Sequence, residues 1–278
     1  MIYAERNGFR MNSAPINNNP IGVFDSGIGG LTVVRELMRE MPNEEIIYFG
    51  DTARVPYGTK TKNTVTRYSM QIMEFLKTKN VKAVIIACGT VSSNSYDELK
   101  KAFKVPLFEM VSNGVAACLS ATKNNRVGII ATEATIKSGK YEQLIKKMNP
   151  EIEVHLKACP LFVPLAEEGW TDNIVAELTA QIYLSELKMK QIDALIMACT
   201  HYPLLSNQIQ KAISDATLIN PAIEAAKNVH LFLQQNNLLR TDVTPPNHRF
   251  FISDNTEKFN RLSQMILPKE YTAELVSL

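Results

Sequence analysis

Short apolar runs alternate with longer amphipathic segments along most of this chain. The runs have the length of strands that are buried on both faces, whereas the longer segments repeat apolar residues at helical spacing. Strands that alternate with helices favour a mostly parallel sheet covered by helices on both faces. The predicted strands cover residues 21–24, 45–50, 82–87, 105–109, 127–132, 193–199, 216–219 and 249–254. The predicted helices include residues 31–38, 61–79, 92–103 and 256–266.

The same pattern occurs twice. Four pairs of segments repeat in the same order, namely residues 21–26 with 127–132, 55–57 with 163–165, 82–88 with 193–199, and 105–108 with 216–219. The offset between the copies grows slowly from 106 (128 − 22) to 111 (199 − 88). Chance similarity of apolar strands explains one such pair, but four pairs in register indicate a duplicated α/β unit.

We therefore predict an α/β fold of two pseudo-symmetric lobes, each a mostly parallel sheet flanked by helices, with an active site in the cleft between them. The first lobe is predicted to comprise residues 20–112 plus 222–278, because the last strand and helix return to complete the first copy. Residues 113–221 form the predicted second lobe. Residues 1–19 are polar, and we expect a flexible N-terminal extension there.

Composition narrows the class of protein. The chain has 278 residues, of which 45% are apolar and 21% are charged, with a net charge of +2. That charge is too small to suggest nucleic-acid binding, and no apolar run reaches the length of a membrane span. Residues 1–20 lack the apolar core of a signal peptide, so a cytoplasmic location is expected. The four cysteines are few for a disulfide scaffold and lack the spacing of a zinc site.

Two of these cysteines, Cys88 and Cys199, follow predicted strands at matching positions of the two copies. Each also precedes a predicted helix, whose N-terminus would favour the thiolate. Two facing lobes would point both thiols into one cleft, where one could remove a proton from a carbon and the other could deliver one to its opposite face. For either thiol alone, a small buried apolar side chain is the ordinary alternative.

A glycine-rich turn follows the first predicted strand. It contains Asp25 and Ser26 but does not supply the G-x-G-x-x-G pattern of dinucleotide sites. Asp25 lies at the carboxyl end of a strand, which is where open α/β sheets bind ligands. The alternative for Asp25 or Ser26 is a helix N-cap.

Several segments together resemble one known family. They are Gly22-Val23-Phe24-Asp25-Ser26-Gly27-Ile28-Gly29-Gly30-Leu31, Asp51-Thr52 with Pro56-Tyr57-Gly58, Ala87-Cys88 with Thr90, Cys159-Pro160-Leu161-Phe162-Val163-Pro164-Leu165 with Glu167, and Cys199-Thr200-His201-Tyr202-Pro203-Leu204-Leu205. With these motifs the chain resembles the cofactor-independent glutamate racemases of the aspartate/glutamate racemase superfamily over roughly residues 20–266. The resemblance implies interconversion of L- and D-glutamate, which supplies D-glutamate for peptidoglycan.

The resemblance also implies roles for individual residues. Cys88 would be the base for the D enantiomer, with Asp25 as its acidic assistant. Cys199 would be the base for the L enantiomer, with Glu167 and His201 as assistants. Taken alone, Glu167 is more typical of a solvated charge, and His201 of a loop histidine whose hydrogen bonds are satisfied.

Further residues match positions where the family holds the charged groups of the substrate through hydroxyls and main-chain N–H groups. The implied substrate-binding residues are Asp25, Ser26, Pro56, Tyr57, Gly58, Gly89, Thr90, Thr132, Thr135, Thr200 and His201. For Thr132 and Thr135, helix capping is the alternative to binding carboxylate.

Gly89 departs from the family, which normally has asparagine between the cysteine and the threonine. Glycine keeps the main-chain N–H but loses the carboxamide donor, so binding or specificity should change while the pair of thiols stays. An aspartate racemase, or a racemase of another acidic amino acid, is therefore a second hypothesis. A small-acid binding protein without turnover is a third, and a thiol hydrolase would leave the second strand-end cysteine unexplained.

Nothing in the sequence calls for a metal or for pyridoxal phosphate, since no lysine lies in the matching motifs. We expect no cofactor and no nucleic-acid or membrane partner. The family suggests a homodimer, and some relatives need a cell-wall precursor as activator.

Overall fold

The computed structural model describes residues 16–254 and 256–278, so most of the predicted extension at residues 1–19 lies outside the described residues. Its described part begins with a short 3-10 helix, η1 (Ile16–Asn18). The main-chain oxygen of Asn17 accepts a hydrogen bond from Lys82 Nζ at 2.6 Å, and Asn18 Oδ1 accepts one from the Thr241 N–H at 3.0 Å. This short helix therefore contacts the folded body, and a flexible extension stays a prediction.

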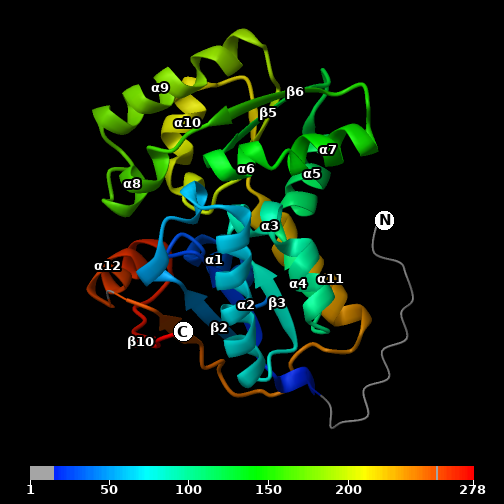
Figure 1. The fold of residues 1–278 in the computed structure, drawn as a ribbon, viewed down its shortest axis with the longest axis vertical. Helices are drawn as coiled ribbons and strands as arrows, with labels where there is room; N and C mark the ends of the chain where they lie inside the picture. Colours follow the sequence, from blue (N-terminus) through cyan, green and yellow to red (C-terminus); the bar gives the residue numbers. More distant parts are fainter. Residues whose placement is uncertain (1–15, 255) are drawn as a thin grey trace.

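Two parallel sheets form the centre of the molecule (Figure 1). The first sheet, in the order β10-β9-β2-β1-β3-β4, has six strands within the described residues. They are β1 (Ile21–Asp25), β2 (Ile46–Gly50), β3 (Ala83–Ile86), β4 (Leu107–Glu109), β9 (Arg249–Ile252) and β10 (Ala273–Leu275). The second sheet runs β6-β5-β7-β8. Its strands are β5 (Arg126–Ala131), β6 (Glu153–Ala158), β7 (Ala194–Met197) and β8 (Thr217–Ile219).

Helices cover both faces of each sheet, as expected for parallel strands that are apolar on both sides. Around the first sheet lie α1 (Leu31–Glu40), α2 (Lys62–Thr78), α3 (Gly89–Asn94), α4 (Tyr96–Ala102), α11 (Pro221–Gln235) and α12 (Thr256–Ile266). Around the second lie α5 (Met110–Ala121), α6 (Glu133–Lys137), α7 (Lys140–Met148), α8 (Phe162–Glu167), α9 (Ile174–Met189) and α10 (Ser206–Ala212). Short 3-10 helices are η2 (Thr52–Arg54), η3 (Tyr57–Thr59) and η4 (Tyr202–Leu205).

The predicted fold class is confirmed, and the strand order bears out the repeat. The central strands β2-β1-β3-β4 and β6-β5-β7-β8 have the same order when the copies are aligned. Gly22 and Gly128 occupy matching strand positions, and at both a Cβ would meet apolar side chains at 3.2 Å or less. The strands at residues 21–109 and 249–275 share one sheet and those at 126–219 share the other, while the exact lobe boundaries stay a prediction.

Each sheet has an apolar core on both faces. On the first sheet, α1, α11 and α12 pack on one face and α2 and α4 on the other. On the second sheet, α8, α9 and α10 cover one face and α5 and α7 the other. No helix among residues 16–254 and 256–278 has the length and apolarity needed to cross a membrane.

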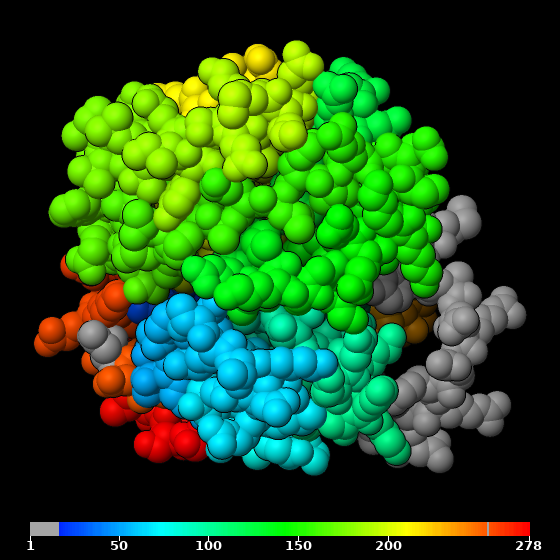
Figure 2. Space-filling model, turned by 45° about the horizontal axis from the view of Figure 1, so that its top comes forward, coloured from blue at the N-terminus to red at the C-terminus, as the bar shows by residue number. Residues whose placement is uncertain are grey.

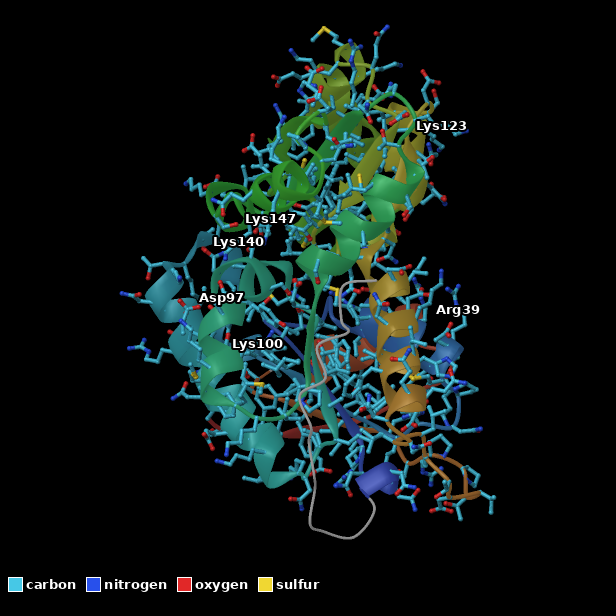
Figure 3. The ribbon with its side chains drawn as sticks, turned by 90° about the vertical axis from the view of Figure 1, so that its right-hand side faces the viewer. Arg39, Asp97, Lys100, Lys123, Lys140 and Lys147 are labelled. Carbon is cyan, nitrogen blue, oxygen red and sulfur yellow. The ribbon has the colours of Figure 1, made fainter. Side chains whose placement is uncertain are left out.

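The lobes touch along much of their facing surfaces (Figure 2). Thr32 Oγ1 donates to the Thr200 main-chain oxygen at 2.9 Å across the interface. At the surface, Lys140 of α7 forms an ion pair with Asp97 of α4 at 2.8 Å, and Figure 3 shows the two side by side. The lobes are therefore in contact both at the centre and at the rim.

Some sequence predictions need correction. The helix expected from residue 92 or 93 to 103 is two helices, α3 and α4, separated at Ser95. The first of them, α3, already begins at Gly89. Within it, Ser92 Oγ donates to the Ile86 main-chain oxygen at 3.1 Å. Strand β10 was not predicted, since residues 273–275 have no apolar run.

Candidate active site

The turn after β1 wraps around the carboxylate of Asp25. This side chain is fully buried, and its Oδ2 accepts hydrogen bonds from the main-chain N–H groups of Gly27 and Gly30 at 3.1 Å each. Its Oδ1 is buried and has no hydrogen-bond partner among residues 16–254 and 256–278. Burial raises the pKa of Asp25, and the charge of His201 and the N–H groups of the turn oppose that rise. Asp25 is thus an acid held in place by the glycine turn.

The helix-capping alternative for this turn is wrong. The N-cap of α1 is Gly30, and no side chain caps that helix. Asp25 binds the N–H groups of the turn itself, and Ser26 Oγ accepts a hydrogen bond from Cys88 Sγ at 3.5 Å. Ser26 therefore reaches Cys88 after β3, and the Asp25 carboxylate is near enough to raise the pKa of that thiol.

Cys88 stands at the N-cap of α3 and is 5% exposed. Burial raises the pKa of its thiol to about 12, and the Asp25 carboxylate adds to this rise while the contact with Ser26 opposes it. The expected thiolate-favouring effect of the helix N-terminus is outweighed here, because α3 is short and the sulfur is buried. At neutral pH Cys88 is a thiol and can donate a proton.

Cys199 follows β7 and has a histidine beside it. Its Sγ lies 3.8 Å from His201 Nδ1, and His201 Nε2 lies 3.0 Å from Glu167 Oε1. The segment after Cys199 is the 3-10 helix η4, so the α-helix predicted to follow this cysteine directly is wrong. The positive charge near Cys199 comes from the histidine instead.

His201 is 6% exposed and charged at neutral pH. Burial by itself lowers the pKa of the imidazole, but the hydrogen bonds and charges of Cys199 and Glu167 outweigh it and raise the pKa to about 10. A cationic imidazole beside the sulfur stabilises negative charge there. The alternative of an ordinary loop histidine does not account for a ring that joins a thiol to a buried carboxylate.

Glu167 ends α8 and is not a solvated charge, since its side chain is 15% exposed. Burial would raise the pKa of its carboxyl, but hydrogen bonds and charges from His201 and Lys258 outweigh it and lower the pKa to about 2. Lys258 Nζ lies 2.6 Å from Glu167 Oε2. Lys258 was not predicted from the sequence, because no local pattern connects a lysine in a C-terminal helix with the end of α8.

The predicted binding threonines meet at the interface between the lobes. Thr90 Oγ1 and Thr132 Oγ1 are 3.0 Å apart, and Thr132 Oγ1 lies 3.1 Å from Thr135 Oγ1. Thr132 is also the N-cap of α6, where its hydroxyl accepts a hydrogen bond from the Thr135 N–H at 3.4 Å. The capping alternative is thus correct for Thr132, and the cap brings this hydroxyl next to Thr90.

The segment Pro56-Tyr57-Gly58 lies next to these threonines, at the start of α6. The hydroxyl of Tyr57 is buried and donates to Asp51 Oδ2. A Cβ at Gly58 would lie 2.7 Å from the Thr132 Cβ, so this main chain is close to α6. The ring of Tyr57 therefore supports the loop, while the main chain at Gly58 faces the threonines.

Two glycines let the lobes approach. A Cβ at Gly89 would lie 2.3 Å from the main-chain oxygen of Ala198, and one at Gly29 would lie 2.5 Å from the ring of His201. Because the obstacle at Gly89 is main chain, a side chain at that position requires the lobes to shift. The asparagine expected from the family resemblance does not fit this arrangement.

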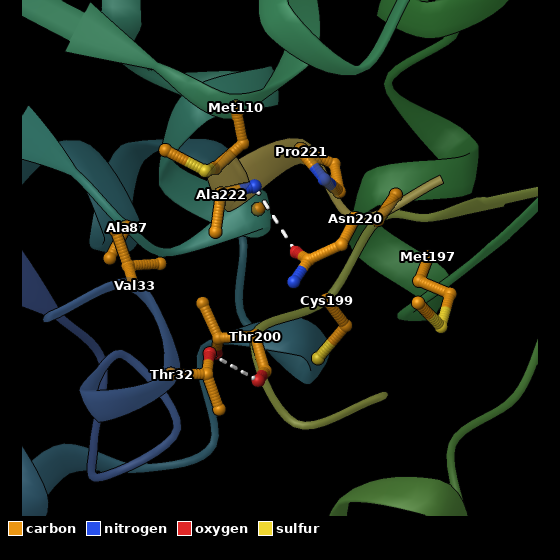
Figure 4. Close-up of a pocket in the computed structure, with 12 residues that line it drawn as sticks. Thr32, Val33, Ala87, Met110, Met197, Cys199, Thr200, Asn220, Pro221 and Ala222 are labelled. Carbon is orange, nitrogen blue, oxygen red and sulfur yellow. Dashed lines mark hydrogen bonds between the residues drawn. The ribbon is translucent and has the colours of Figure 1, made fainter. Parts of the chain in front are cut away.

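Behind Cys199 lies a small cavity of about 10 Å³ (Figure 4), which is room for about one water molecule. Its lining joins the strand ends of both lobes to the start of α11. It comprises Thr32, Val33, Ala87, Gly89, Met110, Met197, Ala198, Cys199, Thr200, Asn220, Pro221 and Ala222. This cavity is too small to hold an amino acid.

Chemically, the arrangement offers two thiols with unequal surroundings in one interface. The charge of Cys199 is among the causes that raise the pKa of Cys88. One side holds a protonated thiol beside a buried acid, and the other holds a sulfur beside an imidazolium. Such a pair can move a proton to and from opposite faces of one carbon atom.

The similar sequences and the similar structures belong to one family of proteins. A sequence model of the Asp/Glu/hydantoin racemases matches residues 21–229. Glutamate racemase of Geobacter metallireducens is 47% identical over 248 residues, covering 89% of this chain and 92% of that protein. The crystal structure of Francisella tularensis glutamate racemase in complex with D-glutamate is 45% identical, with a TM-score of 0.88 over 94% of this chain and 98% of that one. An aspartate racemase structure from Picrophilus torridus is 16% identical with a TM-score of 0.54, which is a likeness of fold alone.

Proposed function

This chain belongs to the Asp/Glu/hydantoin racemase family, and we propose that it interconverts L- and D-glutamate by proton transfer at the α-carbon. Two observations favour glutamate over aspartate. The relative from Geobacter metallireducens and the structure holding D-glutamate are 45% to 47% identical and nearly full length. The aspartate racemase shares only the fold.

The unequal surroundings of the two thiols carry the mechanism. With L-glutamate bound, the sulfur of Cys199 takes the α-proton and the electron pair stays on the α-carbon. The thiol of Cys88, whose pKa of about 12 keeps it protonated, gives its proton to the opposite face and yields D-glutamate. Cys199 then carries one proton more and Cys88 one fewer, which is the state that accepts D-glutamate.

The neighbouring groups assist each transfer. His201 is cationic and stabilises negative charge on Cys199, while Glu167 keeps the imidazole charged. Asp25, whose Oδ1 has no hydrogen-bond partner within the described part of the chain, is the corresponding acid beside Cys88. These five residues are the proposed catalytic set.

The proposed substrate contacts lie on both lobes. They are Asp25, Ser26, Pro56, Tyr57, Gly58, Gly89, Thr90, Thr132, Thr135, Thr200 and His201. For Tyr57 we assign the contact to the main chain, because Asp51 takes its hydroxyl. The N–H groups at the start of α3 suit a carboxylate, since they have no partner within the helix.

Exchange of the α-proton in deuterium oxide tests this function. Both L- and D-glutamate should racemise and gain deuterium at the α-carbon without added metal or pyridoxal phosphate, which also tests the predicted cofactor independence. Binding of glutamate without exchange would overturn catalysis and favour the non-catalytic alternative. Faster exchange of aspartate than of glutamate would overturn the substrate.

The biological setting is part of the proposal. D-glutamate made by this reaction supplies peptidoglycan, and thereby cell-wall biogenesis and cell shape. The chain's four cysteines are all free thiols, which supports a reducing compartment such as the cytoplasm.

We also propose that two copies of the chain associate through α9. Its residues Ile174, Leu178 and Ile182 lie at helical spacing and are 63%, 48% and 71% exposed. Trp170 and Leu161, both more than half exposed, precede the helix. An apolar surface of this kind is typical of an interface between proteins.

A further inference from the structure

We propose that Lys258 is a positioning residue for proton transfer on the Cys199 side, where it holds the Glu167 carboxylate in the orientation that accepts a hydrogen bond from His201. This inference rests on the proposed function and adds a residue of the first lobe to the machinery of the second.

The contact is made by one face of α12. Lys258 Nζ lies 2.6 Å from Glu167 Oε2, and Arg261 Nη2 donates to the Glu167 main-chain oxygen at 3.0 Å. Further along that face, Met265 is the nearest neighbour of a Cβ built on Gly169, at 3.5 Å. Helix α12 packs on the first sheet through Phe259. The end of α8 is thus held by a helix that belongs to the other lobe.

The carboxylate of Glu167 uses its two oxygens for two different cations. Oε2 contacts Lys258 at 2.6 Å, and Oε1 contacts His201 Nε2 at 3.0 Å. On its other side, His201 Nδ1 lies 3.8 Å from Cys199 Sγ. Each side chain thus contacts the next, from Lys258 through Glu167 and His201 to the sulfur of Cys199. Lys258 fixes the plane of the carboxylate, and the carboxylate fixes the imidazole.

Because the Glu167 carboxylate is buried, its charge depends on the ion pair with Lys258. A carboxylate that is 15% exposed is costly to keep charged, and two cations offset that cost. Among the described residues, the charged or titratable groups around Glu167 and His201 are Lys258 and Arg261 of α12, the neighbouring Glu168, Cys199 after β7, Asp25 after β1 and Tyr48 of β2. Lys258 is the ammonium among them that touches the Glu167 carboxylate. Its loss favours a protonated Glu167, which no longer stabilises the imidazolium.

The position of Lys258 also connects the contact between the lobes with the chemistry. Lys258 lies on α12 beside the first sheet, whereas Glu167, His201 and Cys199 belong to the second lobe. The ion pair therefore joins the two lobes next to His201.

The test compares Lys258→Met with the matched variant Arg261→Met, which removes a cation from the same helix face without touching the Glu167 carboxylate. Lys258→Met should lower kcat/KM about tenfold to a hundredfold, while Arg261→Met stays within about threefold of the wild type. The acid limb of the kcat/KM profile should move to higher pH by about 1 to 3 pH units in Lys258→Met and stay in place in Arg261→Met. Lys258→Arg should recover most of the activity, because it keeps the charge and the reach.

A double variant tests whether Lys258 acts through Glu167. In a Glu167→Gln background, the further change Lys258→Met should alter kcat/KM by less than about twofold, since the partner is already neutral. Equal losses in Lys258→Met and Arg261→Met, without a shifted acid limb, would mean that α12 only stabilises the interface and would overturn the inference. An inactive wild-type enzyme would instead overturn the proposed function.

Discussion

At the scale of single residues, the two cysteines are equivalent in the repeat but differ in their surroundings. Cys88 contacts Ser26 and lies near the buried Asp25, whereas Cys199 faces the His201–Glu167 pair. Burial raises the pKa of Cys88 to about 12, and the imidazolium stabilises negative charge at Cys199. The two thiols therefore differ in their electrostatic surroundings, although the repeat makes them equivalent.

Replacing either sulfur by oxygen should stop racemisation. In Cys88→Ser and in Cys199→Ser, kcat/KM should fall by about 10² to 10⁴, because a hydroxyl is a much weaker acid than a thiol. The two enantiomers have equal free energy, so kcat/KM must fall by the same factor in both directions. Polarimetry from each enantiomer measures this.

The buried thiol Cys118 of α5 provides the control, since Cys118→Ala should keep wild-type kcat/KM. Cys88→Ser should exchange the α-proton of L-glutamate for solvent deuterium faster than that of D-glutamate, because the remaining base, Cys199, faces the L enantiomer. Normal racemisation by both serine variants would rule out the two-thiol mechanism.

At the scale of elements, the start of α3 decides how closely the lobes meet. Gly89 opens this helix, and a Cβ there would lie 2.3 Å from the main-chain oxygen of Ala198. The sequence led us to expect that glycine only removes a donor. The structure adds that glycine permits a contact between main chains which asparagine would prevent.

A side chain at position 89 should therefore hold the lobes apart. Gly89→Ala should lower kcat/KM at least about tenfold through raised KM and lowered kcat, although alanine is the better helix former. Gly89→Asn should be no more active than Gly89→Ala, despite its carboxamide. A larger radius of gyration in small-angle scattering, with an unchanged circular dichroism spectrum, would accompany the loss. Higher activity in Gly89→Asn than in the wild type would contradict this prediction.

At the scale of the whole molecule, the lobes form one unit through contacts between distant parts of the chain. Thr32 with Thr200, Thr90 with Thr132, and Lys258 with Glu167 all join the two lobes. The outer surface has a different role, because α9 lies on the outer side of the second lobe (Figure 1) and several of its exposed residues are apolar.

Ile182→Glu should convert the proposed dimer into a monomer. Ile182 is 71% exposed, so a charge there should leave the fold intact while preventing burial of the α9 face. Light scattering at micromolar concentration should give a dimer mass for the wild type and a monomer mass for the variant. Val243→Glu is the control, since Val243 is 97% exposed and lies outside α9. A monomeric wild type would contradict the dimer, and a dimeric Ile182→Glu would exclude α9 as the interface.

The sequence by itself determined the fold class and the repeat. Apolar strands at matching spacing allow few arrangements, and residues next to a strand end lie at the edge of the sheet. For that reason Asp25, Cys88 and Cys199 could be singled out from local pattern, whereas His201 was assigned only through the family resemblance. The end of helix α12 at residue 266 was also predicted, because its apolar residues keep helical spacing.

Only the tertiary structure decided how these residues differ. The protonation of Cys88 depends on burial, and the charge of Glu167 depends on Lys258, which is 91 residues away in the chain. The fit of Gly89 depends on the main chain of the opposite lobe. Burial, charge and steric contact across an interface depend on which distant segments meet, and no local pattern in the sequence contains that information.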